Sequence, residues 1–285
     1  GATSGATSGT TSGLPQWHGF GYCEAMPWQR VDTEPLDIDT GVAPASARAI
    51  AAAVLRRTLP LLVRRDGRAE PLATGTLYRI AGRTLLVTCR HLFDAAVGLG
   101  DLLAPLPGAR RLLPLQSLAR RVVVHPERDL ALIEMARDPA CEALLREWPP
   151  VPIDASALDD DGGMAVPMYV LAGWPYEQMR RVDETVFARP VVVFAARRPG
   201  PAAADLRLSY ARVARRSDGV DVHAPALDGV SGATVWQVLP AGGDDGSGGG
   251  LLLRPAAVQC AFKHDAYARA EALAQARGLV ERVCR

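Results

Sequence analysis

The segment PLATGTLYRIAGRTLLVTCRHLF, residues 71–93, decides the class of fold. It contains two apolar runs, each short enough for a β-strand, with Ala81 and Gly82 between them. Threonine, valine, isoleucine and tyrosine recur in both runs, and these residues favour strands over helices. The segment therefore predicts two successive strands, the second of which ends close to His91.

Runs of the same kind lie on both sides of this segment and indicate an all-β barrel or sandwich. At roughly 150 residues per domain, the 285 residues allow two such units. We expect a first β-barrel at 59–148 and a second at 149–264, with the boundary at Pro149–Pro150. The runs that support this division lie at 61–67, 119–135, 165–174, 184–198, 206–213, 232–239 and 251–263.

The ends of the chain have a different character. Residues 1–13 repeat Gly, Ala, Ser and Thr and predict a flexible linker or tag remnant. The segment 241–250 is too rich in glycine to pack and is predicted to be a loop between two strands. Residues 14–58 are predicted to be an extension with one short helix at Ser46–Arg57, and residues 140–148 one or two helical turns. Apolar and small residues at helical spacing predict a C-terminal helix over 265–285.

The composition excludes several classes of function. The 32 basic and 31 acidic residues nearly cancel, which argues against a dedicated nucleic-acid binder. No apolar run reaches the ~18 residues that span a bilayer, so we expect neither a membrane nor a nucleic-acid partner. Metal-ligand and phosphate-loop patterns are missing, so no cofactor and no metal is predicted. Five cysteines without CxxC spacing, and no export signal, predict a reducing, cytoplasmic compartment.

Three local patterns carry candidate chemistry, and each also has a purely structural interpretation. Ser231 lies in GVSGAT, which suits either a tight glycine turn or a nucleophile whose neighbouring backbone N–H groups approach an oxyanion. His91 ends an apolar strand, either as a satisfied buried polar group or as a general base. Asp129 opens the apolar run DLALIEM, either as a turn residue or as a carboxylate that fixes a histidine tautomer.

Taken together, these patterns resemble the trypsin-like, chymotrypsin-fold serine peptidases. VTCRH at 87–91 resembles the family's TAAH segment, DLAL at 129–132 its DIAL, and GVSGAT at 229–234 its GDSGGP. The stretch ATGTLYRIAGRTLLVT at 73–88 is similar to the strand and hairpin before the catalytic histidine in the bacterial HtrA-like branch. The resemblance covers about residues 59–263 and implies two antiparallel barrels, each of the six-stranded type, with a short N-terminal and a C-terminal helix.

The resemblance implies an intracellular bacterial serine endopeptidase that cleaves a protein or peptide through an acyl-enzyme. Ser231 would be the nucleophile, His91 the base and then the acid, and Asp129 the group that orients His91. The backbone N–H groups of Gly229 and Ser231 would form the oxyanion hole. The family's geometry places the base of the primary pocket six residues before the nucleophile; the candidates for it are Pro225, Ala226, Leu227 and Asp228. An uncharged pocket base predicts cleavage after small or apolar residues.

Departures from the family pattern also have consequences. Val230 stands where the digestive enzymes have the aspartate that receives a new N-terminal ammonium, so that activation switch is not expected. Another device must hold the oxyanion loop: either the loop forms correctly from the start or a regulatory protein partner orders it, and hydrogen bonds of Asp228 would bias its shape. His125 and His223 are alternative bases. The alternatives for the whole chain are a protease-like binding or sensing module whose site is unused or gated by a partner, and an esterase.

Overall fold

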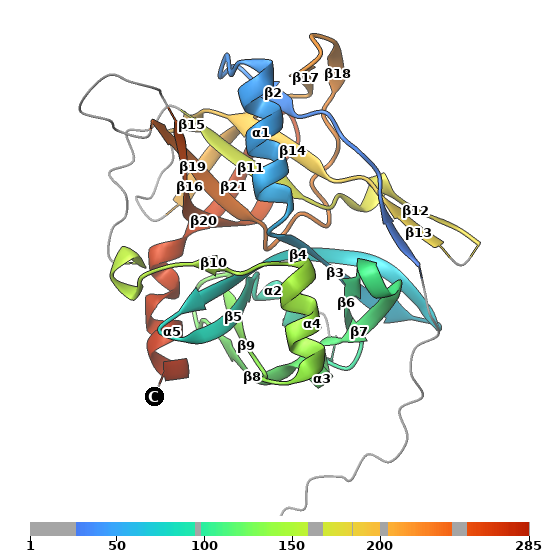
Figure 1. Ribbon diagram of the computed structural model, residues 1–285. Coiled ribbons are helices and arrows are strands. Elements are labelled where there is room, and N and C mark those ends of the chain that lie inside the picture. Colours follow the sequence, from blue (N-terminus) through green and yellow to red (C-terminus); the bar gives the residue numbers. More distant parts are fainter. Residues whose placement is uncertain are drawn as a thin grey trace, which may run out of the picture.

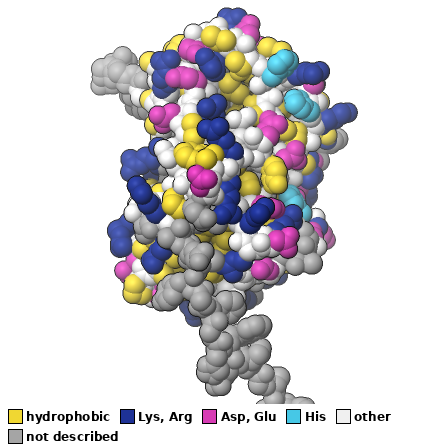
Figure 2. Space-filling view, turned by 90° about the vertical axis from the view of Figure 1, so that its right-hand side faces the viewer, with side chains coloured by type: hydrophobic (Ala, Val, Ile, Leu, Met, Phe, Trp, Pro, Cys, Tyr) yellow, Lys and Arg dark blue, Asp and Glu magenta, His cyan; other side chains and the backbone are white. Residues whose placement is uncertain are grey.

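The computed structural model describes residues 27–94, 98–158, 168–183, 185–199, 205–240 and 250–284. The described residues form two large curled sheets, one above the other in Figure 1, and a small three-stranded sheet beside them. The prediction of a mostly β chain with two barrel-like sheets is therefore confirmed. On the face shown in Figure 2, basic, acidic and apolar side chains are interspersed.

The first sheet is built from residues 58–152, and its strand order is β7-β6-β3-β4-β5-β9-β8, with β10 parallel to β4. Its strand β10 follows Pro149–Pro150, so this sheet extends past the proline pair. Its strands are β3 (Thr58–Arg65), β4 (Arg68–Ile80), β5 (Arg83–Thr88), β6 (Leu102–Leu106), β7 (Arg111–Pro114), β8 (Ala119–Val124), β9 (Ala131–Met135) and β10 (Val151–Pro152).

The hairpin of β4 and β5 is the one that the sequence predicts. Ala81 and Gly82 connect the strands with φ angles of 48° and 73°, and two left-handed residues give a turn that matches the twist of the paired strands. Successive side chains of a strand point to opposite faces. In β5, Leu86 packs inside the first barrel while Leu85 and Val87 pack toward the second sheet. Both faces are buried, which explains the unbroken apolar run.

The second sheet has the strand order β15-β16-β21-β20-β19-β11-β14-β2-β17-β18. It includes β2 from the N-terminal extension, which pairs in parallel with β14. Its strands are β2 (Leu36–Ile38), β11 (Tyr169–Gly173), β14 (Val191–Ala195), β15 (Arg197–Arg198), β16 (Asp205–Tyr210), β17 (Val213–Arg216), β18 (Asp221–His223), β19 (Thr234–Pro240), β20 (Leu251–Lys263) and β21 (Ala266–Ala272).

Three apolar clusters hold the described residues together. One fills each barrel, and the third lies between the two sheets, where Tyr78 of β4 and Trp236 of β19 are both buried. Two helices cover this shared core: α1 (Pro44–Leu55) above and α5 (Arg277–Cys284) along the side in Figure 1. The remaining α-helices are α2 (His91–Asp94), α3 (Leu115–Leu118) and α4 (Pro139–Glu147).

The prediction of a helix from residue 265 onward is wrong for its first part. Residues 266–272 form β21, which pairs with both β16 and β20. Ala268 and Ala270 alternate with more exposed residues and pack in the barrel core, so this alanine spacing serves a strand as well as a helix. The helix begins only at Arg277, after a 3₁₀ turn at Leu273–Ala276.

The described part of the N-terminal extension, from residue 27 onward, contains more regular structure than its composition indicates. Besides β2 it contributes β1 (Trp28–Arg30), which joins the small sheet with β12 (Met179–Val182) and β13 (Thr185–Ala188). Trp28 is buried against Trp174, with ring centroids 5.5 Å apart. The predicted linker at 1–13 and all but Gly250 of the glycine-rich loop at 241–250 lie outside the described residues.

Candidate functional site

His91 and Asp129 are brought together by the pairing of β5 with β9. His91 begins α2, directly after β5, and Asp129 lies in the loop that leads into β9. The His91 Nδ1–H donates to Asp129 Oδ2 at 2.7 Å, and the His91 backbone N–H donates to Asp129 Oδ1 at 2.9 Å. Two hydrogen bonds from one residue to one carboxylate fix both the orientation and the tautomer of the ring, so that Nε2 is the free basic nitrogen.

The same contacts shift the pKa values of His91 and Asp129. The hydrogen bond that His91 donates to Asp129, and after it the contact with Cys89, raises the pKa of His91 above its ordinary value. Burial alone would raise the pKa of Asp129, but the hydrogen bonds from His91 outweigh burial and lower it. Asp129 is therefore ionised at neutral pH and stabilises an imidazolium on His91.

Nε2 of His91 faces a thiol in this structure. Cys89 Sγ lies 3.4 Å from it, and Cys89 is fully buried at the end of β5. A protonated His91 donates its Nε2–H to this sulfur, which favours the charged ring and agrees with the raised pKa of His91. The Ser231 hydroxyl forms no hydrogen bond with any described residue. His91 and Asp129 are thus joined directly, whereas Ser231 is placed by its backbone.

The loop at 228–232 has a regular pattern of backbone hydrogen bonds. The carbonyl groups of its first four residues, Asp228 to Ser231, each accept a hydrogen bond. Of the N–H groups, those of Val230 and Gly232 donate, to Leu227 at 2.9 Å and to Gln259 at 2.7 Å. Those of Gly229 and Ser231 donate to no described residue. Two alternate N–H groups therefore stay free on either side of Val230, as an oxyanion site requires.

Glycine is required at two positions of this loop. Gly229 has a φ of +89°, and a Cβ there would lie 2.7 Å from the carbonyl oxygen of Trp174. Gly232 has a φ of +93°, and a Cβ there would lie 2.0 Å from the Thr74 carbonyl oxygen and 3.2 Å from the Cys89 nitrogen. The close approach at Gly232 sets the backbone next to Ser231 directly against the end of β5, two residues before His91.

Arg128 connects the Asp129 loop to the second sheet. Its guanidinium lies 3.5 Å from Glu271 of β21 and 3.9 Å from Asp205 of β16. Glu271 is buried, and burial raises its pKa above the ordinary value. This ion-pair cluster spans the two sheets immediately beside Asp129 and supports the placement of that loop.

The four residues predicted for the substrate pocket occupy different surroundings. Pro225 and Ala226 line a cavity of about 300 Å³ together with Glu177, whose Oε1 accepts the Ala226 N–H at 2.9 Å. Leu227 is fully buried in the core of the second barrel. Asp228 is exposed, and its carboxylate forms no hydrogen bond with a described residue. It is the Asp228 carbonyl that anchors the loop, through the Tyr176 N–H at 2.6 Å.

The ring of His125, an alternative base, forms hydrogen bonds within the turn that follows it in the sequence. Its Nδ1 accepts the backbone N–H groups of Glu127 at 3.1 Å and Arg128 at 2.9 Å. His223, the other alternative, ends β18 and lines the same cavity as Pro225. Among the described residues, neither ring forms a hydrogen bond with Ser231.

We expect His125→Asn to leave kcat/KM for a peptide substrate within about tenfold of the wild-type value, because asparagine retains an acceptor for the turn. Steady-state kinetics measure this. A loss as large as that of His91→Ala would instead identify His125 as the base.

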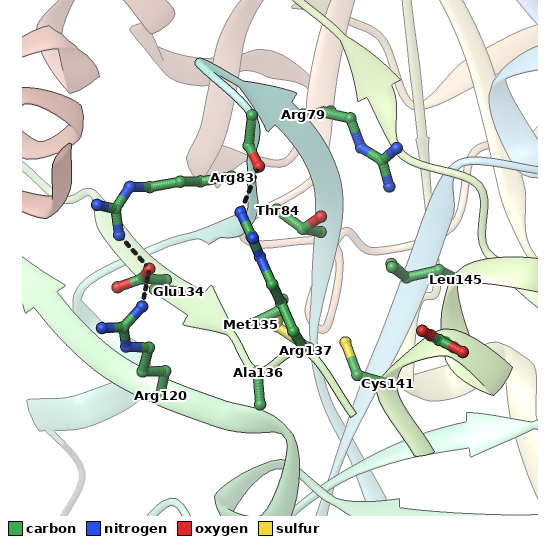
Figure 3. A pocket seen from close by; sticks show the side chains of 12 residues that line it. Arg79, Arg83, Thr84, Arg120, Glu134, Met135, Ala136, Arg137, Cys141 and Leu145 are labelled. Carbon is green, nitrogen blue, oxygen red and sulfur yellow. Dashed lines mark hydrogen bonds and ion pairs between the residues drawn. The ribbon is translucent and has the colours of Figure 1, made fainter. Parts of the chain in front are cut away.

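A cavity with a larger volume lies elsewhere, on the first barrel (Figure 3). It measures about 550 Å³ and is lined by Arg79, Arg83, Arg120 and Arg137 around the buried Glu134. Arg83 and Arg120 bind Glu134 at 2.5 and 3.4 Å. None of its lining residues belongs to the predicted site.

The described residues also lack two features. They contain no group of three His, Cys, Asp or Glu side chains that could hold a metal ion. None of their helices has the length and apolarity needed to cross a bilayer.

Comparison with solved structures identifies the architecture. Human heparin binding protein aligns with a TM-score of 0.50 and 14% identity, over 80% of this chain and 91% of that one. The fold is chymotrypsin-like. A Drosophila clip serine protease, Grass, gives a TM-score of 0.44 at 10% identity over 88% of this chain and 71% of that one. At these identities the likeness concerns the fold alone.

Sequence comparison adds nothing to this. No family model matches the chain, and no curated protein matches it. The candidate site is therefore argued from the residues of this chain alone.

Sequence reasoning missed Thr74, Cys89 and Arg128. Each lies in or next to a segment that the sequence analysis names as part of the candidate site. The role of each, however, depends on a contact between the two sheets or across a turn. Only the proximity of Cys89 and Arg128 to His91 and Asp129 in the sequence could have drawn attention to them.

Proposed function

We propose that this chymotrypsin-like chain is a serine endopeptidase that cleaves protein or peptide substrates. The observation that carries the proposal is the free N–H groups of Gly229 and Ser231, set beside the end of β5 that leads to the His91–Asp129 pair. A carbonyl oxygen that becomes negatively charged needs such donors, and a hydroxyl nucleophile needs such a base.

In the proposed reaction the Ser231 Oγ attacks the scissile carbonyl carbon while His91 Nε2 takes its proton. The resulting oxyanion accepts from the Gly229 and Ser231 N–H groups. His91 then gives the proton to the leaving amine, and water hydrolyses the acyl-enzyme by the same steps. The Nε2 contact moves from the Cys89 thiol to the Ser231 hydroxyl when substrate binds, since hydrogen bonds of this type commonly tighten only in the complex.

A peptide library incubated with the purified chain tests the proposal. We expect cleavage by the wild type and none by Ser231→Ala, with sites after small or apolar residues because Pro225 and Ala226 are uncharged. Dominant cleavage after Arg or Lys, lost in Glu177→Gln or Asp228→Ala, would contradict the apolar pocket and name the carboxylate responsible. Identical peptide profiles for wild type and Ser231→Ala would contradict the peptidase itself.

The raised pKa of His91 has a consequence for the pH profile. The base must be neutral, so kcat/KM should rise with pH through the His91 pKa, and its acid-side midpoint should lie above pH 6.5. In Cys89→Ala the second cause of the shift is removed, and the midpoint should move to lower pH. Cys89→Ser, whose hydroxyl oxygen still accepts a hydrogen bond from the protonated ring, should give a midpoint between the two. A midpoint that is the same in all three proteins would show that the thiol does not affect His91.

We also propose a bacterial, intracellular setting, on the HtrA-like resemblance of residues 73–88. The four cysteines within the described residues are all unpaired thiols, which supports a reducing compartment.

A further inference from the structure

Thr74 holds the loop at 228–232 from the opposite sheet. It lies in β4 of the first sheet, is fully buried, and is bonded to the loop at two points. Its hydroxyl donates to the Gly229 carbonyl at 2.8 Å, and its backbone N–H donates to the Ser231 carbonyl at 2.8 Å.

The hydroxyl of Thr74 is itself held in place. The hydroxyl oxygen accepts the Trp174 N–H at 3.3 Å, and this contact restricts rotation of the hydroxyl group. The hydroxyl hydrogen then points toward the Gly229 carbonyl. The Thr88 hydroxyl donates to the Thr74 carbonyl at 2.9 Å and fixes the backbone from the β5 side. Both polar groups of the Thr74 backbone and its hydroxyl are therefore committed.

Because the peptide group is planar, a hydrogen bond that fixes a carbonyl also fixes the direction of the N–H group in the same plane. In a trans peptide the C=O and the following N–H point in opposite directions. Because Thr74 holds the Gly229 carbonyl, the Val230 N–H points the other way, to Leu227. Because Tyr176 holds the Asp228 carbonyl, the Gly229 N–H points away from Tyr176 and stays free. Every carbonyl group from Gly229 to Ser231 thus accepts a hydrogen bond. A flip of any of these peptide planes would break that bond.

We propose that Thr74 is a positioning residue that keeps the oxyanion site preformed, in place of an ammonium–carboxylate pair at Val230. This proposal rests on the proposed function for its kinetic consequence but not for its structural one. It assigns the loop a fixed active shape without proteolytic release of a new N-terminus, and it replaces the expectation that the Asp228 side chain holds the loop.

The kinetic test compares Thr74→Val, Thr74→Ser and Thr58→Val on a peptide ester substrate. Thr58 is an equally buried threonine whose hydroxyl donates to the Val54 carbonyl, away from the loop, and serves as the matched control. We expect Thr74→Val to lower kcat by about 10- to 100-fold with KM within about threefold, since the donors act mainly in the transition state. Thr74→Ser and Thr58→Val should keep kcat within about threefold. Equal kcat values for the two valine variants would overturn the proposal.

A second readout does not depend on activity. Amide hydrogen exchange at Val230 and Gly232 should be about tenfold or more faster in Thr74→Val than in wild type or Thr58→Val, because local opening of the loop becomes easier. Unchanged exchange at both amides would overturn the proposal even if the chain turned over no substrate. A wild type that fails to react with fluorophosphonate, combined with faster exchange in Thr74→Val, would reject the peptidase and retain the positioning role.

Discussion

Replacing Ser231, His91 or Asp129 by alanine should each remove most of the peptidase activity, by about 10⁴- to 10⁶-fold in kcat, while the chain stays folded. The reason is that the nucleophile, the base and the orienting carboxylate act in one proton transfer. His91 is half-exposed and Ser231 only partly buried, so neither side chain contributes much to the core.

The losses should also be strongly non-additive. Once Ser231→Ala has removed the nucleophile, adding His91→Ala should lower the remaining rate by less than about tenfold. Steady-state rates of the single and double variants, with circular dichroism as the control for folding, measure this. Independent losses that multiply would mean that the two residues do not act on the same step.

Gly232→Ala should be the most destabilising single substitution in the loop. A Cβ at this position would lie 2.0 Å from the Thr74 carbonyl oxygen and 2.2 Å from the Thr88 hydroxyl, in a region of φ that alanine avoids. The clash is with backbone of the other sheet, which cannot move without opening the contact between the sheets. We expect a loss of about 3 kcal/mol or more in the free energy of unfolding.

Gly219→Ala is the matched control for that substitution. Gly219 has a φ of +89°, close to that of Gly232, but a Cβ there would meet no atom within 4 Å. It should cost only the backbone strain, about 1 to 2 kcal/mol. Urea denaturation of both variants separates strain from clash, and equal losses would show that the sheets do not meet closely at Gly232.

The sequence predicted the local features of this molecule well. The β4–β5 hairpin was readable because its apolar runs and its Ala81–Gly82 turn lie within 23 consecutive residues. His91 and Asp129 were readable as a pair because each stands at the end of a strand in a familiar order along the chain. Both inferences depend on neighbours in the sequence, where chain geometry limits the outcomes.

Features that depend on distant contacts were not readable. The alanines at 268 and 270 fit a helix as well as a strand, and only pairing with β16 and β20 decided for the strand. Pairing of β2 with β14 gave order to an extension whose sequence has no clear period. The two hydrogen bonds of Thr74 to the loop cross 155 and 157 positions of the chain, and no local pattern signals them.

The central claim is that Ser231 is an activated nucleophile, and reaction with a fluorophosphonate tests it most directly. The account predicts that the wild type gains one phosphonyl group, that peptide mapping by mass spectrometry places it on Ser231, and that His91→Ala slows the labelling by orders of magnitude. An absence of labelling in the folded wild type, or equal labelling of the wild type and Ser231→Ala, would contradict the claim and favour a protease-like binding module.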